Sequence, residues 1–414
     1  DSAEATLNLP RRYGVDDFPI VVQSQQFDSL NQVLWRGMQD SILLVNGTEN
    51  PMTSIPSQVV RMRLLNASQE RNFNFGFTGN KSFYVIGNDG GLLNAPVSVT
   101  RIRLSPGERA EILVDLSGMS GQTIYLMSYA SEFPVGVQGG TPMPGMGTTM
   151  ASPINGIDFN ILQLNIGAQT LSPILTVPTS LVTVTPWLSS QSNITRNITI
   201  SAQNMMSMDG PFYFNNLLFD MNRIDYTIPL NNIEIWSLTN QTMVAHPFHI
   251  HDVQFFVLDR DGITVQPQES GYKDVVMIAP QETVRFITKF EDFADASMPY
   301  MYHCHILMHE DDGMMGQFVV VPNSTGVIEP KVTGNISVYP NPISANELTV
   351  TLENSIVTNA TVSISNIIGQ EFIHSTSIVE SNLIKIDVST LPAGNYFLKI
   401  VFGNQTAIAK IFKQ

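Results

Sequence analysis

The segment from Met301 to His309, MYHCHILMH, contains the only cysteine of the chain, Cys304, which stands between His303 and His305. If this segment is a β-strand, consecutive side chains point to opposite faces, so Cys304 faces one way and the two histidines face the other. A thiolate, imidazoles and a weak axial thioether are the ligands of a blue-copper electron-transfer site. One strand can therefore contact two metal sites at once.

A second histidine cluster lies upstream, in the string HPFHIH that begins at His246. His249 and His251 are two residues apart, so on a strand they share a face. Six of the seven histidines of the chain lie in these two clusters. This grouping favours metal ligation over histidines that merely fill a core.

Sorting the side chains by face gives two ligand sets. The first combines one thiolate, two imidazoles and a distant thioether: Cys304, His246, His309 and Met314. The second contains imidazoles alone: His249, His251, His303 and His305. Copper suits both sets, whereas structural zinc sites favour several thiolates.

The strings HPFHIH, ESGYKDVV and HCHILMHEDDGMMGQF resemble the C-terminal signature of the multicopper oxidases. The resemblance is to bacterial three-domain enzymes of the laccase, bilirubin oxidase and cuprous oxidase types. It implies a type 1 copper bound by His246, Cys304 and His309, with Met314 as the axial ligand, because the family's spacing from Cys304 favours Met314 over the adjacent Met315. It also implies a type 2 copper at His249 and a type 3 copper pair at His251, His303 and His305. No cofactor other than copper is expected.

The same resemblance implies an activity and a role for one acid. A small donor, phenolic or similar, is oxidised one electron at a time, electrons cross through Cys304 to His303 and His305, and O₂ is reduced to water. Glu310 matches the family's proton donor, although Asp311 and Asp312 follow it and a solvated loop acid is the alternative. Asp274 either orients a ligand histidine or is a surface turn acid.

Two groups of methionines raise the alternative of a cuprous oxidase for copper tolerance, because thioethers bind Cu(I). They are Met143, Met146 and Met150, and Met205, Met206 and Met208. Flexible packing is the other explanation for them. The family's cuprous oxidases carry an acid and a methionine just before HPFHIH, together with a long Met-rich insert. Here that approach reads Thr242-Met243-Val244-Ala245 and no long insert exists, which favours a laccase-like range of donors.

The family's trinuclear cluster takes eight histidines, four of them from an N-terminal domain, but no histidine precedes His246. The opening string LPRRYGVDDFPIVVQSQQF resembles the start of the family's second domain. We therefore expect a fragment that lacks an N-terminal cupredoxin domain and is inactive alone. The alternatives are a type 1 copper electron-transfer or copper-binding protein, and a relative that has lost copper, against which the intact ligands argue.

An internal repeat predicts the fold. The string LSPGERAEILVDL parallels IAPQETVRFITKF, with Pro106 matching Pro280 and Glu108 matching Glu282. Two copies of one β-domain follow, and short alternating strands between Gly, Pro and Asn turns indicate Greek-key sandwiches. Where the second copy has His246, His249 and His251, the first has residues such as Arg71, Asn74 and Phe77.

The predicted organisation is all-β. Residues 1–165 form a cupredoxin-like domain without copper ligands, 166–191 a Pro/Ser/Thr-rich linker, 192–325 the cupredoxin-like copper domain, and 335–414 a small C-terminal β-sandwich. In this last segment, YPNP and LPAGNYFLKI resemble the C-terminal sorting domain of the type IX secretion system of Bacteroidota. That resemblance implies export by the secretion machinery, to the cell surface or beyond.

Composition excludes several partners. The net charge of −15 disfavours nucleic acid and anionic membranes. No apolar run reaches the roughly 18 residues that a membrane span needs. Residues 1–20 lack the basic and apolar regions of a signal peptide, and we expect a monomer.

Overall fold

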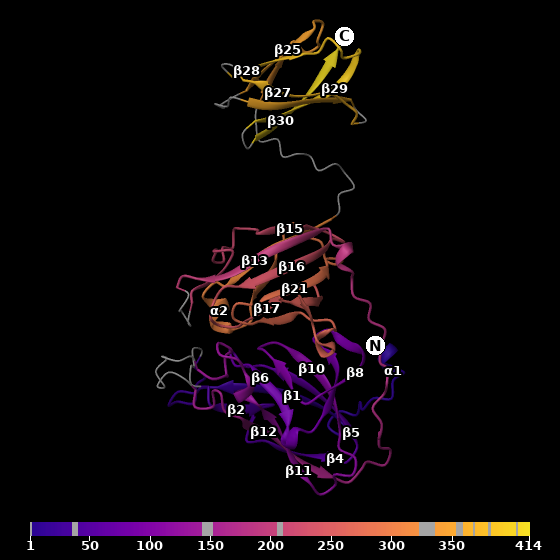
Figure 1. Ribbon diagram of the computed structural model, residues 1–414, viewed down its shortest axis with the longest axis vertical. Helices are drawn as coiled ribbons and strands as arrows, with labels where there is room; N and C mark the ends of the chain where they lie inside the picture. The colour runs from indigo at the N-terminus through magenta and orange to yellow at the C-terminus, as the bar shows by residue number, and fades with distance from the viewer. Residues whose placement is uncertain are drawn as a thin grey trace. The chain divides into compact units, whose positions relative to one another are not determined.

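The computed structural model describes residues 2–34, 40–142, 152–204, 210–322, 336–352, 359–366, 369–379, 382–402 and 405–414. Among these residues strands predominate, and the α-helices are two short ones, α1 (Ser2–Ala5) and α2 (Leu307–Asp311). The chain forms two compact units, Asp1–Asn323 and Ser324–Gln414. The all-β prediction is confirmed, and Figure 1 shows the strands of each sandwich stacked in layers.

The first sandwich pairs a seven-stranded sheet with a five-stranded one. In spatial order, the larger sheet contains β3 (Thr48–Glu49), β2 (Ile42–Val45), β1 (Asp17–Gln25), β5 (Val59–Asn66), β10 (Arg109–Asp115), β7 (Phe83–Asn88) and β8 (Gly91–Val99). The smaller contains β4 (Met52–Pro56), β12 (Phe159–Gly167), β11 (Thr123–Ser128), β6 (Phe73–Phe77) and β9 (Ile102–Leu104). Alternating apolar side chains such as Val85, Ile112 and Leu126 are fully buried between the sheets, as expected for sandwich packing.

The second sandwich repeats this arrangement. Its larger sheet runs β14 (Phe212–Phe214), β13 (Ile194–Ala202), β16 (Ile233–Asn240), β21 (Thr283–Lys289), β18 (Phe255–Arg260) and β19 (Ile263–Thr264). Its smaller sheet runs β15 (Tyr226–Pro229), β23 (Met315–Val321), β22 (Tyr300–Cys304), β17 (His246–Ile250) and β20 (Val275–Ile278). The matching strand orders confirm the internal repeat.

Side-chain contacts also match between the copies. The Glu108 carboxylate accepts the Ser105 backbone N–H at 2.6 Å, and Glu282 accepts that of Ala279 at 2.7 Å. Each pair closes the turn around the matched proline, because a carboxylate there satisfies a backbone N–H that would otherwise be buried without a partner. The predicted match of Glu108 with Glu282 is thus confirmed.

The predicted match at the histidine positions was wrong in register. Phe73 pairs with Leu104 in the first copy, as His246 pairs with the equivalent Ile278 in the second. The residues at the positions of His246, His249 and His251 are therefore Phe73, Gly76 and Thr78, rather than Arg71, Asn74 and Phe77. The error arose because the chain before the strand differs in length, and only the ladder fixes the register. Phenylalanine, glycine and threonine are not side chains that copper selects.

The segment between the sandwiches runs extended along both of them. Ile174 and Leu181 pack with Leu9, Val59 and other buried side chains of the first sandwich. Trp187 packs edge-on against Phe256 of the second, with ring centroids 5.5 Å apart. The prolines of this segment suit an extended chain that joins no sheet.

The second compact unit is a smaller sandwich. A three-stranded sheet contains β24 (Ile336–Tyr339), β25 (Glu347–Leu352) and β28 (Leu383–Asp387). A four-stranded sheet contains β27 (Glu371–Ile378), β26 (Asn359–Asn366), β29 (Gly394–Phe402) and β30 (Gln405–Lys413). Val350, Val362 and Leu398 are among its fully buried core residues. The predicted domain boundaries at 325 and 335 lie outside the described residues.

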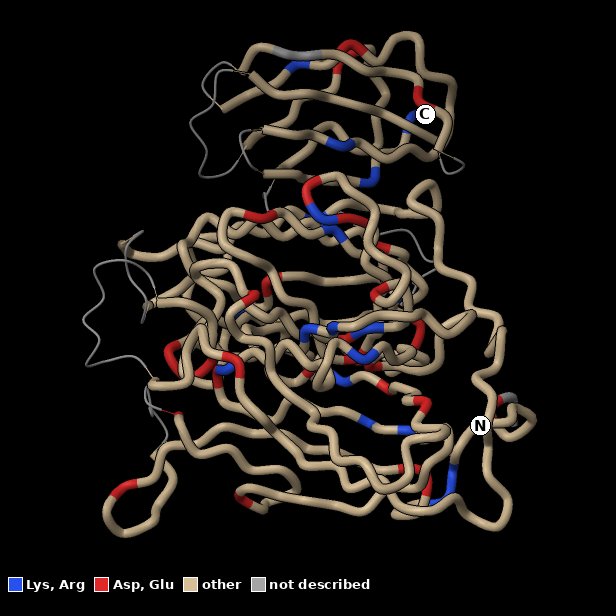
Figure 2. Tube along the Cα trace, turned by 60° about the horizontal axis from the view of Figure 1, so that its bottom comes forward, with Lys and Arg blue, Asp and Glu red and all other residues tan. Residues whose placement is uncertain are grey.

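Charged residues are sparse along the trace, with acidic and basic positions interspersed (Figure 2). Within the described part of the chain, no helix has the length and apolar character to cross a bilayer.

Candidate metal centres

Strand β22 carries side chains of the two ligand sets on its two faces. It lies between β17 and β23, in a register that sets Phe248 opposite Cys304 and His249 opposite His303. Cys304 points into the sandwich core and is fully buried. The ring of His303 points the other way, with its centroid 5.3 Å from that of His249. The predicted division of the strand into two faces is therefore observed.

The first set gathers around the cysteine. The Sγ of Cys304 lies 3.7 Å from Nδ1 of His246 and 3.5 Å from Nδ1 of His309. These three side chains can hold a metal ion, and all three are buried. Phe212 packs against both rings, with centroid distances of 4.6 Å to His246 and 4.4 Å to His309. An apolar wall of this kind excludes water from the donor atoms.

Burial sets the protonation of this first set. It lowers the pKa of His309 to about 3. It also lowers the pKa of His246, and the neighbouring His309 lowers that pKa further. Both rings are therefore neutral at pH 7 and keep a lone pair for a cation. Burial raises the pKa of the Cys304 thiol, so the thiolate needs a bound cation to stabilise it. A metal supplies that charge, which fits this donor set.

A hydroxyl group orients His246. The Oγ1 of Thr242 lies 2.9 Å from Nε2 of His246, and it donates its own hydrogen to Oδ1 of Asn240 at 2.8 Å. The hydroxyl therefore accepts the Nε2–H of His246, which leaves Nδ1 free to face Cys304. No pattern in the sequence pointed to this role of Thr242, although it stands only four residues before His246.

The two adjacent methionines differ in their surroundings. Met314 is fully buried in the same apolar cluster as Cys304, and its carbonyl accepts the Cys304 backbone N–H at 3.1 Å. Met315 begins β23 opposite His303 and lines a cavity of about 160 Å³ with Phe214. The surroundings of Met314 are those that an axial ligand needs.

The second set lies where β17 and β22 pair. His249, His251 and His303 place one nitrogen each within 4.8 Å of one another and can hold a metal ion. His305 is beside them, with its ring centroid 5.6 Å from those of His249 and His303. Burial lowers the pKa of His249 to about 4, so this ring is also neutral at pH 7. A cluster of four imidazoles suits copper.

Asp274 orients a histidine, but through its backbone. The Nδ1–H of His249 donates to the Asp274 carbonyl at 2.7 Å. The carboxylate of Asp274 instead binds the two terminal nitrogens of Arg109 at 2.6 and 2.7 Å. Arg109 belongs to the first sandwich, and no signal in the sequence pointed to it.

Glu310 reaches the second set from α2. Its Oε2 lies 3.2 Å from Nδ1 of His303. Burial raises the pKa of this carboxyl, but the hydrogen bond with His303 and the electrostatic effect of the nearby imidazoles together outweigh burial, so the pKa is lowered overall. Its position beside a candidate ligand distinguishes it from a fully solvated loop acid.

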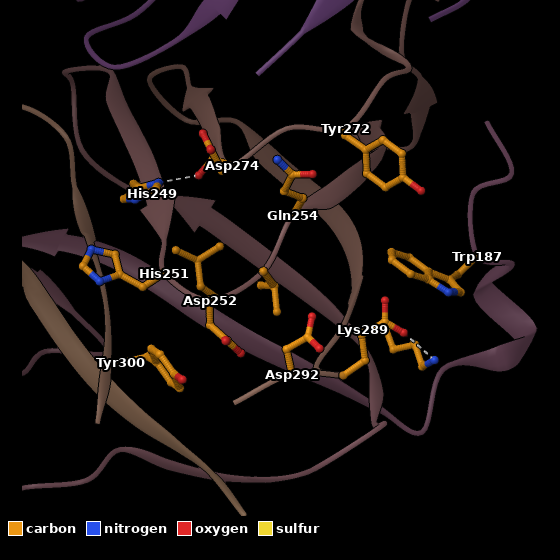
Figure 3. A pocket seen from close by; sticks show the side chains of 13 residues that line it. Trp187, His249, His251, Asp252, Gln254, Tyr272, Asp274, Lys289, Asp292 and Tyr300 are labelled. Carbon is orange, nitrogen blue, oxygen red and sulfur yellow. Dashed lines mark hydrogen bonds and ion pairs between the residues drawn. The ribbon is translucent and has the colours of Figure 1, made fainter. Parts of the chain in front are cut away.

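The imidazole face opens onto a cavity of about 730 Å³ (Figure 3). His249 and His251 line one side of it, while Trp187 and Tyr272 lie on the side away from them. Asp252 and Tyr300 complete the part nearest to His251. The two methionine groups predicted from the sequence, Met143 to Met150 and Met205 to Met208, lie outside the described residues.

Three parts of the chain match known families. Residues 18–148 and 189–324 each match a model described as multicopper oxidase. Residues 337–414 match a secretion system C-terminal sorting domain. A laccase-like multicopper oxidase from Ochrobactrum sp. has a similar structure, with a TM-score of 0.64 and 30% identity over 78% of this chain and 70% of that one. This chain belongs to the multicopper oxidase family.

Its curated relatives carry two kinds of name. The multicopper oxidase mco of Staphylococcus haemolyticus is 32% identical over 76% of this chain and 61% of its own length. The cell division protein FtsP of Xenorhabdus nematophila is 33% identical over 78% of this chain and 64% of its own length. The chain thus spans less than two thirds of either relative. Copper is the cofactor that the family implies, and the sorting domain marks the chain for export by type IX secretion to the cell surface or beyond.

Proposed function

We propose that this chain is the larger part of a laccase-like multicopper oxidase. It would couple one-electron oxidation of a small donor, phenolic or similar, to reduction of O₂ to water. The observation that carries the proposal is the placement of Cys304 and His303 on opposite faces of β22, each within a separate donor set. Copper bound at these residues supplies the one-electron redox chemistry and the reduction of O₂.

Each site residue has a role in the proposal. His246, Cys304 and His309 hold the type 1 copper, with Met314 as the axial ligand. His249 holds the type 2 copper, and the type 3 pair is held by His251, His303 and His305. The burial of Cys304 and its two partners supports this division, because a dry site lowers the reorganisation that accompanies electron transfer.

Half of the trinuclear cluster lies in this chain under the proposal. The remaining imidazoles come from an N-terminal cupredoxin domain that seats against His249 and His251. Support comes from the open cavity that His249 and His251 line, whereas His246, Cys304 and His309 are buried. The chain alone therefore binds copper but does not turn over, and we propose that it is monomeric.

Glu310 holds and transfers protons in the proposal. Oxygen reduction consumes protons, and a carboxyl beside the cluster can relay them. Its Oε2 lies within 3.2 Å of His303, and the side chain is half-buried, so it touches both the cluster and solvent. Glu310→Gln keeps the shape but removes the acid, and should slow O₂ reduction in the completed protein without changing its blue colour.

Three other functions remain as alternatives. A type 1 electron-transfer or copper-binding protein would use the first donor set alone, and the intact second set argues against it. A cell-division role has support from the FtsP relatives, but does not need six clustered histidines and a buried cysteine. A cuprous oxidase would need Cu(I) sites, and no acid stands in the segment Thr242-Met243-Val244-Ala245 just before His246, where that type carries one.

The test compares the chain alone with the chain joined to a cupredoxin domain that bears two HxH motifs. Both are loaded with copper, and O₂ uptake is measured with Cu(I), phenols and bilirubin, while light scattering gives the mass. We expect a blue, monomeric chain without O₂ uptake, and a completed protein that consumes O₂ with phenols. Turnover by the chain alone would overturn the half-cluster, and a colourless copper-loaded chain would overturn the oxidase proposal.

A further inference from the structure

Side chains of the first sandwich, which carries none of the proposed copper ligands, bind Lys273 and Asp274 just before β20. Arg109 binds the carboxylate of Asp274 with both terminal nitrogens, as described above. The Asp89 side chain is completely buried, and its Oδ2 lies 3.1 Å from Nζ of Lys273 and accepts the Asp274 backbone N–H at 3.3 Å. Lys273 also contacts Glu108 at 2.9 Å. Lys273 and Asp274 are thus both bound by charged side chains of the first sandwich.

Arg109 is itself held in place. Its guanidinium donates to the carbonyls of Asp89 at 2.9 Å and Gly107 at 3.1 Å. Its backbone N–H donates to Oδ1 of Asp89 at 2.7 Å. A planar guanidinium fixed at several points presents a rigid two-pronged donor, which a flexible lysine cannot reproduce. Arg109 therefore helps to fix the orientation of the Asp274 peptide, whose carbonyl also accepts the Ile250 backbone N–H at 3.4 Å.

The Asp274 carbonyl determines which ring nitrogen of His249 carries the proton and which keeps its lone pair. A neutral imidazole has one N–H, and a backbone carbonyl can only accept a hydrogen bond. Because the Asp274 carbonyl lies 2.7 Å from Nδ1, the proton must be on Nδ1 and the lone pair on Nε2. An acceptor that fixes the tautomer of a ligand histidine is worth roughly 10–100-fold in metal affinity.

The same loop of the first sandwich touches a second histidine of the set. A Cβ added at Gly107 would lie 2.6 Å from Nε2 of His305, and the residue has φ +83°. Only glycine fits this approach, because a side chain would collide with the ring and strain the backbone. The loop from Leu104 to Arg109 is thus shaped around the imidazole set.

We propose that Arg109 is a positioning residue for the imidazole set: through Asp274 it holds His249 as the Nδ1–H tautomer, with Nε2 directed to the metal. The inference rests on the proposed function only in taking that metal to be copper. It gives the ligand-free sandwich a part in building the metal site, beyond joining its neighbours.

If Arg109 only held the two sandwiches together, a different result would be expected. Arg109 would then affect stability alone, as any interdomain ion pair does. Arg285 offers the matched control, since it makes a similar two-pronged contact with Asp259, with Nε 3.0 Å from Oδ2, on the second sandwich. No described contact of Arg285 leads to a candidate ligand.

The first measurement needs no copper. Long-range proton–nitrogen NMR spectra of the ¹⁵N-histidine chain at pH 7 distinguish protonation at Nδ1 from protonation at Nε2, and a His249→Gln spectrum assigns the signal. We expect Nδ1–H in the natural chain and in Arg285→Gln, and a mixture of the two tautomers in Arg109→Gln. An Nε2–H signal in the natural chain, or an unchanged Nδ1–H signal in Arg109→Gln, would overturn the proposal.

The second measurement is Cu(II) titration in a Cys304→Ser background, which removes the type 1 site. Arg109→Gln should weaken Cu(II) binding by about tenfold or more, and Arg285→Gln should leave it unchanged. Equal loss in both variants would show that the effect is general loosening. If Arg109→Gln fails to fold, Arg109→Lys keeps the charge but loses the two-pronged contact, and the same weakening is expected from it.

The two proposals fail in different ways. If the natural chain takes up no copper, the proposed function fails while the tautomer measurement still tests Arg109. If the natural chain is blue and Arg109→Gln matches it in tautomer and affinity, the positioning role fails and the proposed function stands.

Discussion

His303 and Cys304 are neighbours on β22, yet they reach neighbouring residues of α2 on different sides of the strand. The Sγ of Cys304 lies 3.5 Å from Nδ1 of His309, and Nδ1 of His303 lies 3.2 Å from Oε2 of Glu310. A strand directs consecutive side chains to opposite faces, and a short helix that crosses its end can meet both. Two donor sets are thereby joined by one peptide bond.

Replacing the thiol should separate the two sets experimentally. Cys304→Ser should lose the blue absorption and one copper per chain, because serine does not form a soft thiolate ligand. Optical spectra and copper analysis measure both effects. His251→Gln serves as the control, since it should keep the blue band. A blue Cys304→Ser protein would refute the assignment of this cysteine.

The two adjacent methionines should differ in their effect on the type 1 potential. Met314→Leu removes a weak axial thioether and should raise the reduction potential, because that ligand stabilises the oxidised metal. Met315→Leu, on the cavity beside Phe214, should leave it nearly unchanged. Redox titration of the blue band measures both. A larger shift from Met315→Leu would reverse the assignment.

Thr242 should stabilise the metal-free chain through His246. Thr242→Val leaves the Nε2–H of a fully buried ring without an acceptor, which should cost about 1–3 kcal/mol. Guanidinium unfolding of the metal-free protein measures the loss. Thr242→Ser restores the hydroxyl and should recover most of the stability, and equal losses in the two variants would point to packing instead.

Stability should fall at acid pH through Glu269, in the 3₁₀ turn η4 (Pro267–Glu269). Burial raises the pKa of this carboxyl, but the Arg260 guanidinium, which it contacts directly, outweighs burial and lowers the pKa below the ordinary 4.5. The folded chain therefore binds this proton less readily than the unfolded chain does. The resulting stability is present above about pH 4.5 and is lost as pH falls through the lowered pKa.

Glu269→Gln tests this dependence. Unfolding midpoints measured from pH 7 to pH 3 should fall less steeply in the variant than in the natural chain. The difference at pH 7 should be about 1 kcal/mol, because the pair is partly exposed and screened by solvent. Glu371→Gln, whose carboxylate is exposed beside His374 in the small sandwich, is the control. Parallel pH profiles for the natural chain and Glu269→Gln would contradict the prediction.

Much of the site follows from local patterns in the sequence. The two-residue spacing of His303 and His305 around Cys304 specifies the two faces as soon as the segment is a strand. The repeat of the turn around Pro106 and Pro280 likewise predicts a duplicated sandwich, because each copy reuses the same carboxylate to close it. Such features lie within a few residues of one another, so alternation and turn chemistry determine them.

The register and the contacts between sandwiches required the tertiary structure. The pairing of Phe73 with Leu104 corrected the match that the sequence had placed at Arg71, since register depends on a partner strand. Arg109 and Asp274 are 165 residues apart, and no local pattern links them. The sequence by itself determined which residues are candidate copper ligands. Which nitrogen His249 presents was decided only by folding, because the Asp274 carbonyl that accepts its Nδ1–H lies just before another strand, 25 residues away along the chain.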